Sequence, residues 1–225
     1  MTTTVVVRDV IRIHRRAGEE VRALDGVSLD VQAGEVVALL GPSGSGKSSL
    51  LHLLCGWEQP DRGTVAWSDA ALIRTWKGTA VVPQNLGLLD ELSIRENVAL
   101  PLRLGPVSRE DARDVDDLLE SLGIVHLADR SVDEVSLGEQ QRAAVARALV
   151  AKPRLLLADE PTAHLDHALV QEVFSHLRGA SAAGTAVVVA THDPSGLEHA
   201  DRIVRMRDGR IEAVEEPPMS GSLTR

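Results

Sequence analysis

The sequence predicts an α/β fold built around a mostly parallel β-sheet. Three short apolar runs, at residues 36–40, 155–158 and 186–190, are typical of strands that are buried on both faces. Each run ends in a polar or glycine-rich segment, and helical patterns lie between the runs. Strands that alternate with helices indicate parallel pairing, because parallel neighbours need a long crossover connection.

The other elements are assigned in chain order. Residues 5–14 and 27–31 alternate loosely between apolar and polar β-prone residues, which predicts an N-terminal antiparallel β subdomain. Residues 80–82 and 203–206 are candidates for further strands of the main sheet. Helical patterns are found at residues 47–54, 108–122, 138–150 and 167–177.

These elements suggest one domain over residues 1–225 with an internal division. Residues 1–84 and 151–212 are expected to form the α/β core with its antiparallel edge. Residues 85–150 lack a convincing buried strand and are interpreted as an inserted α-helical subdomain. Residues 213–225 are rich in Glu and Pro without apolar periodicity, so we expect a frayed tail.

Composition narrows the function classes. With 225 residues, 44% of them hydrophobic and 25% charged, the chain resembles an ordinary globular protein. A net charge of −9 argues against nucleic acid as a partner. The single cysteine, Cys55, excludes an internal disulfide and is expected to be a small buried residue. No apolar run approaches the ~20 residues of a spanning helix, so a role at a membrane requires a partner there.

Residues 41–48 fit the pattern G-x-x-x-x-G-K-[ST] between a predicted strand and a predicted helix. In such a loop the backbone N–H groups point inward at phosphate oxygens, and the helix N-terminus adds positive potential. Lys47 would reach the β- and γ-phosphates, and the Ser48 hydroxyl would ligate Mg²⁺. The pattern predicts a P-loop NTPase core. The expected phosphate-binding residues are Gly41, Ser43, Gly44, Ser45, Gly46, Lys47, Ser48 and Ser49.

Polar residues also follow the other two buried runs, where ligands bind in an open α/β sheet. Asp159 is expected to hold Mg²⁺ through water, and Glu160 to polarise the attacking water as a general base. His192 would hydrogen-bond the γ-phosphate or that water. The alternatives are a solvated turn for the acidic pair and a structural histidine at a strand end.

Five features occur in one order along the chain: residues 41–48, Gln84, residues 135–142, residues 155–160 and His192. Together they resemble the ATPase subunit of ABC transporters, over about residues 5–212. Residues 80–102 are similar to exporters of the lipoprotein-release and macrolide-efflux type. The resemblance implies ATP hydrolysis with Mg²⁺ that powers a membrane exporter, at the cytoplasmic face of the cell membrane, where an integral-membrane permease holds the subunit.

The resemblance also implies roles for residues in a dimer, either a homodimer or a heterodimer with another ATPase subunit. Gln84 would touch Mg²⁺ and relay the nucleotide state to the permease, whose coupling helix would contact the surface around residues 86–97. Ser136 and Gly138 look like the signature segment, which meets the γ-phosphate bound by the opposite subunit. Asp166 looks like the aspartate at the dimer seam, and an ordinary helix N-cap is a compatible reading. ATP would close the dimer and hydrolysis would open it.

Two positions depart from the family pattern. Leu137 stands where the signature usually has glycine; its side chain adds bulk close to the opposing nucleotide and would be strained if the backbone there has a positive φ, and either effect would impair hydrolysis. His14 stands where an aromatic ring normally stacks on adenine, so His14 is either the stacking residue or an ordinary strand residue. The Leu137 departure keeps a second function open, that of a weakened or regulatory ATP switch of an envelope or cell-division complex without transport.

Overall fold

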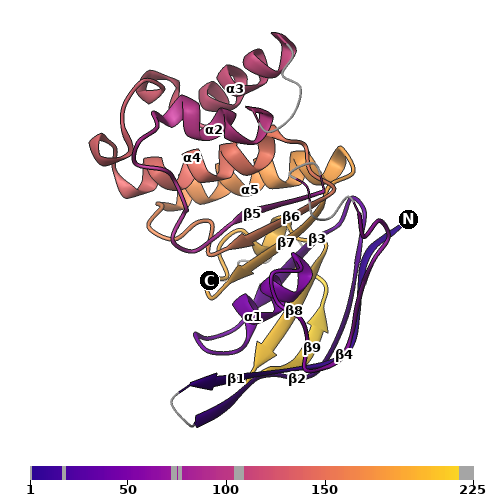
Figure 1. Cartoon of the computed structure of the whole chain (residues 1–225). Helices are drawn as coiled ribbons and strands as arrows, with labels where there is room; N and C mark the ends of the chain where they lie inside the picture. The colour runs from indigo at the N-terminus through magenta and orange to yellow at the C-terminus, as the bar shows by residue number, and fades with distance from the viewer. Residues whose placement is uncertain (1, 17–18, 72–74, 76–77, 104–108, 218–225) are drawn as a thin grey trace, which may run out of the picture.

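The computed structural model describes residues 2–16, 19–71, 75, 78–103 and 109–217. Its centre is a six-stranded sheet in the order β5-β6-β7-β3-β8-β9 (Figure 1). Neighbouring strands pair in parallel except for β8 and β9, which confirms the predicted mostly parallel sheet. The bounds are β3 Val36–Leu40, β5 Thr79–Val82, β6 Leu155–Asp159, β7 Ala186–Thr191, β8 Arg202–Arg207 and β9 Arg210–Glu215.

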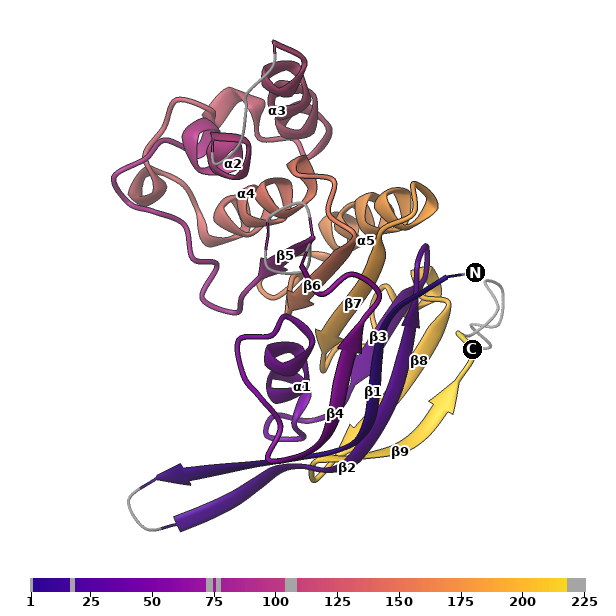
Figure 2. The same cartoon turned by 45° about the vertical axis from the view of Figure 1, so that its right-hand side comes forward.

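Every residue of β3, β6 and β7 is buried because helices cover both faces of the sheet. Helix α1 (Lys47–Leu54) packs on one face, and α4 (Leu137–Val150) and α5 (His167–Ala182) lie on the other (Figure 2). The prediction of α1 has the observed bounds. Helix α5 continues five residues beyond the predicted end at residue 177.

The N-terminal antiparallel sheet is also confirmed, in the order β2-β1-β4. It shares one hydrophobic core with α1 and the central sheet, so α1 is enclosed between the two sheets. Strand β4 was not predicted, because most of its residues are exposed and they show no apolar alternation. The bounds are β1 Thr3–Arg16, β2 Glu19–Gln32 and β4 Arg62–Trp67.

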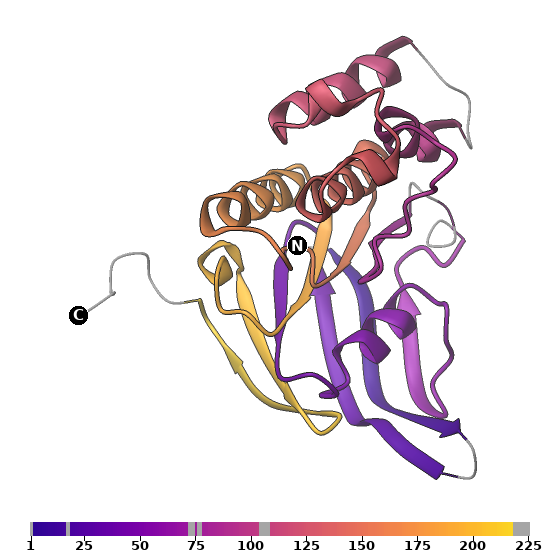
Figure 3. The same cartoon turned by 90° about the vertical axis from the view of Figure 1, so that its left-hand side faces the viewer.

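The inserted helical subdomain has a hydrophobic core of its own. Helices α2 (Ile94–Arg103) and α3 (Arg109–Ser121) pack on the side of α4 away from the sheet (Figure 3). Residues 141–150 of α4 are all buried, because one face contacts the main core and the other contacts this smaller one. Within the described parts of the chain, no helix has the length and apolarity that crossing a membrane requires.

The expectation of a frayed tail from residue 213 is wrong for residues 213–215. They belong to β9, which pairs antiparallel with β8 and places Val214 opposite Val204. Strand β9 is an edge strand in which only Ile211 and Ala213 are partly buried, so its sequence carries too little apolar signal to mark a strand. Glu216 and Pro217 have no regular structure, and the rest of the expected tail, residues 218–225, lies outside the described residues.

Candidate active site

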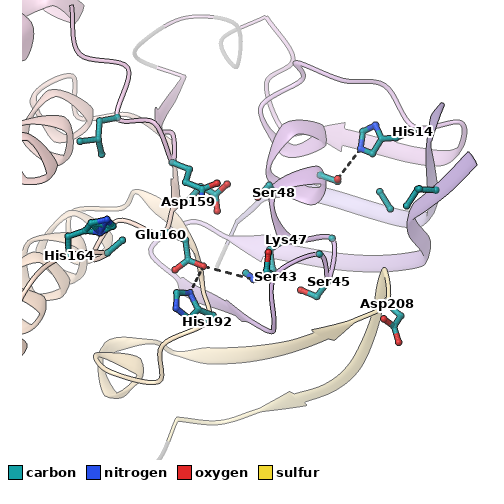
Figure 4. A pocket seen from close by; sticks show the side chains of 18 of the residues that line it. His14, Ser43, Ser45, Lys47, Ser48, Asp159, Glu160, His164, His192 and Asp208 are labelled. Carbon is teal, nitrogen blue, oxygen red and sulfur yellow. Dashed lines mark hydrogen bonds and ion pairs between the residues drawn. The ribbon is translucent and has the colours of Figure 1, made fainter. Parts of the chain in front are cut away.

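A cavity of about 870 Å³ opens at the carboxyl ends of the parallel strands (Figure 4). Gln84 follows β5, Asp159 ends β6 and His192 follows β7, while the phosphate loop, residues 41–48, connects β3 to α1. The parallel topology therefore brings together residues that range from position 41 to position 192 of the sequence. The predicted residues that line the cavity are His14, Ser43, Gly44, Ser45, Gly46, Lys47, Ser48, Ser49, Gln84, Asp159, Glu160 and His192.

Backbone contacts fix the phosphate loop in place. Gly46 has φ +100°, and a Cβ atom there would lie 2.4 Å from the Ala23 carbonyl oxygen. Gly41 does not line the cavity; it packs against β8, where a Cβ atom would lie 2.2 Å from the Met206 oxygen. Gly44 also has a positive φ, +80°, but has open space around it. Gly46 is therefore required by close approach as well as by backbone conformation, whereas Gly41 is required by close approach alone.

We expect Gly46→Ala to destabilise the protein by about 3 kcal/mol and to prevent nucleotide binding, because the added methyl group displaces the loop from β2. The matched control is Gly44→Ala, which adds only the conformational cost of about 1–2 kcal/mol. Urea denaturation and binding of a fluorescent ATP analogue measure the two effects. Equal destabilisation in the two variants would show that the close approach at Gly46 is unimportant.

Lys47 is a buried cation at the N-terminus of α1. Its ammonium group donates hydrogen bonds to the Gly41 oxygen at 2.6 Å and to the Pro42 oxygen at 3.1 Å. It also lies 4.0 Å from Glu160 Oε1. The positive charge is thus held inside the loop, where phosphate oxygens can replace the loop carbonyls as acceptors.

Ser48, Gln84 and Asp159 line both the main cavity and an adjoining cavity of about 500 Å³. They offer a hydroxyl, an amide oxygen and a carboxylate. Such hard oxygen donors, completed by water and phosphate oxygens, are the set that Mg²⁺ prefers. The residues present therefore fit a magnesium ion.

Glu160 is held at three points. Its N–H donates to the Ala190 oxygen at 2.8 Å, and its carbonyl oxygen accepts from Gln141 Nε2 at 3.1 Å. Its carboxylate Oε1 lies 3.0 Å from His192 Nδ1. The backbone has φ +52°, an unusual value for a residue other than glycine. This conformation aims the carboxylate into the cavity beside Lys47, as Figure 4 shows.

His14 lies on the other side of the phosphate loop from Glu160 and His192 (Figure 4). Its Nε2 is 3.1 Å from Ser49 Oγ. Val21 of β2 pairs with His14 across the hairpin and lines the same part of the cavity. The imidazole therefore lines the cavity on that side of the phosphate loop, and its stacking on a nucleobase stays a prediction.

Ser136, Gly138 and Asp166 are described residues that do not line this cavity. Ser136 caps α4: its N–H and its hydroxyl both donate to Glu139 Oε2 at 2.7 Å. The hydroxyl hydrogen bond is the main reason why the pKa of Glu139 is lower than usual. Asp166 caps α5 by accepting from the Leu169 N–H at 3.0 Å, which confirms the helix-cap reading.

The strain expected at Leu137 is absent. Leu137 is the first residue of α4 and is not one of the described residues with a positive φ. The first position of a helix accepts any L-residue, so leucine needs no special backbone here. Its side chain is 46% exposed and reaches the cavity wall. The expectation of lowered hydrolysis therefore loses its backbone argument.

Accordingly, we expect Leu137→Gly to leave ATP turnover within about twofold of the unchanged protein. The same substitution should cost up to about 1 kcal/mol of stability, because glycine is a poorer helix former. Phosphate release and thermal unfolding measure the two quantities. A several-fold rise in turnover would show that the leucine side chain obstructs the site after all.

Further residues line the cavity that were not predicted, among them Gln141, His164 and Asp208. Gln141 holds the Glu160 backbone, a tertiary contact between residues 19 positions apart that no local pattern reveals. His164 and Asp208 both have a positive φ. The Asp-Gly pair at 208–209, one residue beyond a predicted strand, is a turn signal that would have placed Asp208 at this edge.

Comparison with known proteins gives consistent matches. Residues 24–163 match the sequence family described as ABC transporter. The lipoprotein-releasing system ATP-binding protein LolD 2 of Caulobacter vibrioides is 44% identical over 219 residues, which cover 92% of this chain and 96% of the relative. LolD of Gluconobacter oxydans is 42% identical, over 87% of this chain and 90% of that protein.

Solved structures agree with the sequence matches. The ATP-binding cassette MJ0796, solved as a dimer in a post-hydrolysis state with ADP and phosphate, superposes with a TM-score of 0.86. It is 31% identical, and the match covers 94% of this chain and 98% of that one. The similarity therefore includes both sheets and the helical subdomain.

Proposed function

The chain belongs to the ABC transporter family as an ATP-binding and ATP-hydrolysing subunit, and we propose that it powers a membrane exporter by closing as a dimer on ATP and opening after hydrolysis. The observation that carries the hydrolytic part is the cluster of Lys47, Glu160 and His192 at one sheet edge. In this cluster the Lys47 ammonium group is available to bind phosphate oxygens, and the Glu160 carboxylate is available to accept a proton from the attacking water.

The contacts of this cluster suggest the following division of roles. Lys47 would exchange the Gly41 and Pro42 carbonyls for β- and γ-phosphate oxygens. Glu160 would accept a proton from a water molecule as that water attacks the γ-phosphorus, and the bond to the β–γ bridging oxygen would break. The products are ADP and phosphate. His192 would hold the Glu160 carboxylate in position and contact the departing phosphate.

Ser48, Gln84 and Asp159 would hold the magnesium ion that accompanies ATP. When bound, Mg²⁺ neutralises negative charge on the phosphate oxygens. Asp159 is buried at the end of β6, so its carboxylate position is fixed by the sheet. Gln84 is exposed at the start of a loop, so its amide is the member of this set whose position depends on other contacts.

The dimer proposal rests on what the cavity lacks in one copy of the chain. Ser136 and Gly138, which resemble the signature segment, lie at the start of α4 but outside the chain's own cavity. A helix N-terminus favours an anion, so a phosphate bound by a second subunit is a suitable partner for this end. MJ0796, which is similar over nearly the whole chain, was solved as a dimer.

A second surface is suited to a membrane partner. A cavity of about 660 Å³ is lined in part by Trp57, Pro83, Gly87, Leu89 and Leu100, which we call the docking surface. Trp57 is 61% exposed and Leu89 is 43% exposed, so two large apolar side chains face solvent at its rim. A coupling helix of an integral-membrane permease would cover them.

We expect affinity-tagged protein to retain an integral-membrane protein from detergent-solubilised membranes and to turn over ATP several-fold faster in that complex. Trp57→Ser combined with Leu89→Ser should abolish the association by removing the two exposed apolar contacts. Turnover by the purified chain alone should stay unchanged. If the double variant retains the same membrane protein in the same amount, the docking surface is assigned wrongly.

A regulatory ATP switch without transport was the alternative function. Its support was the leucine at position 137, and the backbone strain that this leucine could have caused is absent. Glu160 and His192 are moreover placed together, as hydrolysis requires. We therefore favour the transport ATPase.

A further inference from the structure

The loop from Pro83 to Ser93, which we call the Gln84 loop, joins β5 to α2. Two buried side chains of the helical subdomain hold its backbone. The Arg147 guanidinium, on α4, donates to the carbonyl oxygens of Leu86 and Gly87. The Asn97 side chain, on α2, forms hydrogen bonds with the loop backbone at Leu89.

Asn97 uses every polar atom of its side chain on this loop. Its Oδ1 accepts from the Leu89 N–H at 2.8 Å. Its Nδ2 lies within hydrogen-bond distance of the carbonyl oxygens of Leu89 at 3.0 Å, Leu92 at 3.1 Å and Ser93 at 3.1 Å. Asn97 has no exposed surface, so these carbonyls have a fixed donor in place of water.

Arg147 is unusual among buried charges. It is 5% exposed, and within the described residues it makes no ion pair with a carboxylate. Its recorded hydrogen-bond partners are two carbonyl oxygens, of Leu86 and Gly87, and both of those residues have φ near +60°. A buried arginine without an acidic partner is costly unless its donors are satisfied, and the donors of Arg147 are satisfied by the backbone of this loop.

The Gln84 loop connects two functional surfaces. At its start, Gln84 lines the nucleotide cavity beside Ser48 and Asp159. In its middle, Leu89 is exposed on the docking surface, and Arg147 lines the same docking cavity. Hydrogen bonds between residues close in sequence, such as that from the Leu86 N–H to the Pro83 oxygen at 2.9 Å, keep the loop compact between Gln84 and Leu89.

We propose that Arg147 and Asn97 are positioning residues that make the Gln84 loop move as one body with the helical subdomain. The relay between the docking surface and Gln84, which the family resemblance implies, then runs through these two residues. The inference rests on the proposed function, since it gives the docking surface a route to the site. Neither residue lines the nucleotide cavity, so both act through Gln84.

The test compares Arg147→Met, which keeps the length of the side chain but removes its donors, with Arg147→Lys, which keeps one charged donor. Two readouts are measured on the purified chain: amide hydrogen exchange of residues 83–93, and the Mg²⁺ concentration for half-maximal binding of a fluorescent ATP analogue. The matched control is Lys152→Met, which removes a surface ion pair with Asp114 just beyond the end of α4.

In Arg147→Met we expect roughly tenfold faster exchange in the loop and a roughly tenfold higher half-saturating Mg²⁺ concentration. Binding of the analogue in EDTA should not change, because Gln84 acts only through the metal. Arg147→Lys should restore part of both effects, and Lys152→Met should match the unchanged protein. In Asn97→Asp a carboxylate oxygen would face three carbonyls, so the loop should again exchange faster.

Two results would overturn the inference. One is a folded Arg147→Met variant with unchanged loop exchange and unchanged Mg²⁺ dependence. The other is faster exchange throughout the helical subdomain, together with an equal loss of analogue affinity in Mg²⁺ and in EDTA. That result would show that Arg147 only stabilises the subdomain. If Arg147→Met does not fold, the same two measurements are made on Arg147→Lys. Unchanged loop exchange and unchanged Mg²⁺ dependence in that variant would overturn the inference. Failure of the unchanged chain to bind the analogue at all would instead contradict the proposed function.

Discussion

Lys47→Ala is expected to reduce ATP turnover at least about 100-fold, because it removes the cation that would face the charge developing on the phosphates. Lys47 is buried, and its ammonium group already lies inside the phosphate loop. Its neighbours Asp159 and Glu160 are acidic, and the other cation among the described lining residues, Arg22, is exposed and paired with Asp25. Neither feature replaces the positive charge that Lys47 places inside the loop.

Phosphate release and binding of a fluorescent ATP analogue measure the Lys47 effect. Arg178→Met is the control. Arg178 lies on α5, away from the cavity, and the substitution removes its surface ion pair with Asp201. Thermal unfolding checks that both variants remain folded. Turnover within threefold of the unchanged protein in Lys47→Ala would refute the assignment of residues 41–48 as the phosphate loop.

Glu160→Gln is expected to lower turnover about 100- to 10,000-fold while ATP still binds, because a neutral amide cannot accept the proton of the attacking water. The side chain keeps its shape, and its backbone contacts with Ala190 and Gln141 do not involve the carboxylate. The control is Glu172→Gln, which removes an acid from α5 outside the cavity. If Glu160→Gln retains turnover, another group is the general base.

The central part of the fold was predictable from the sequence because its strands are continuous apolar runs. Burial on both faces forces β3, β6 and β7 to be apolar at every position, and such runs are visible without any tertiary information. Strands β4 and β9 escaped prediction for the opposite reason. Both lie at sheet edges and expose most of their residues.

The candidate site was predictable where it depends on topology. Once the strands are parallel, the residues after them must meet at one edge, which places Asp159, Glu160 and His192 beside the phosphate loop. Contacts that cross between subdomains were not predictable. Gln141 contacts Glu160 across the two subdomains, and Arg147 contacts the Gln84 loop about 60 positions away in the sequence; neither spacing follows a local period.

Leu137 illustrates a third kind of limit. A departure from a family motif showed which side chain differed, but it did not show which backbone conformation the position has. Only the structure places Leu137 at the first turn of α4, where leucine is acceptable. For the same reason, the sequence did not reveal the positive φ of Glu160.

The most direct test of the central claim is the molar mass of Glu160→Gln, measured by size-exclusion chromatography with light scattering. With ATP and Mg²⁺ the account predicts the mass of a dimer, because two copies share two nucleotides that neither can hydrolyse. With ADP it predicts the monomer mass of 24.1 kDa. A monomer mass in both nucleotides would contradict closure between two copies of this chain.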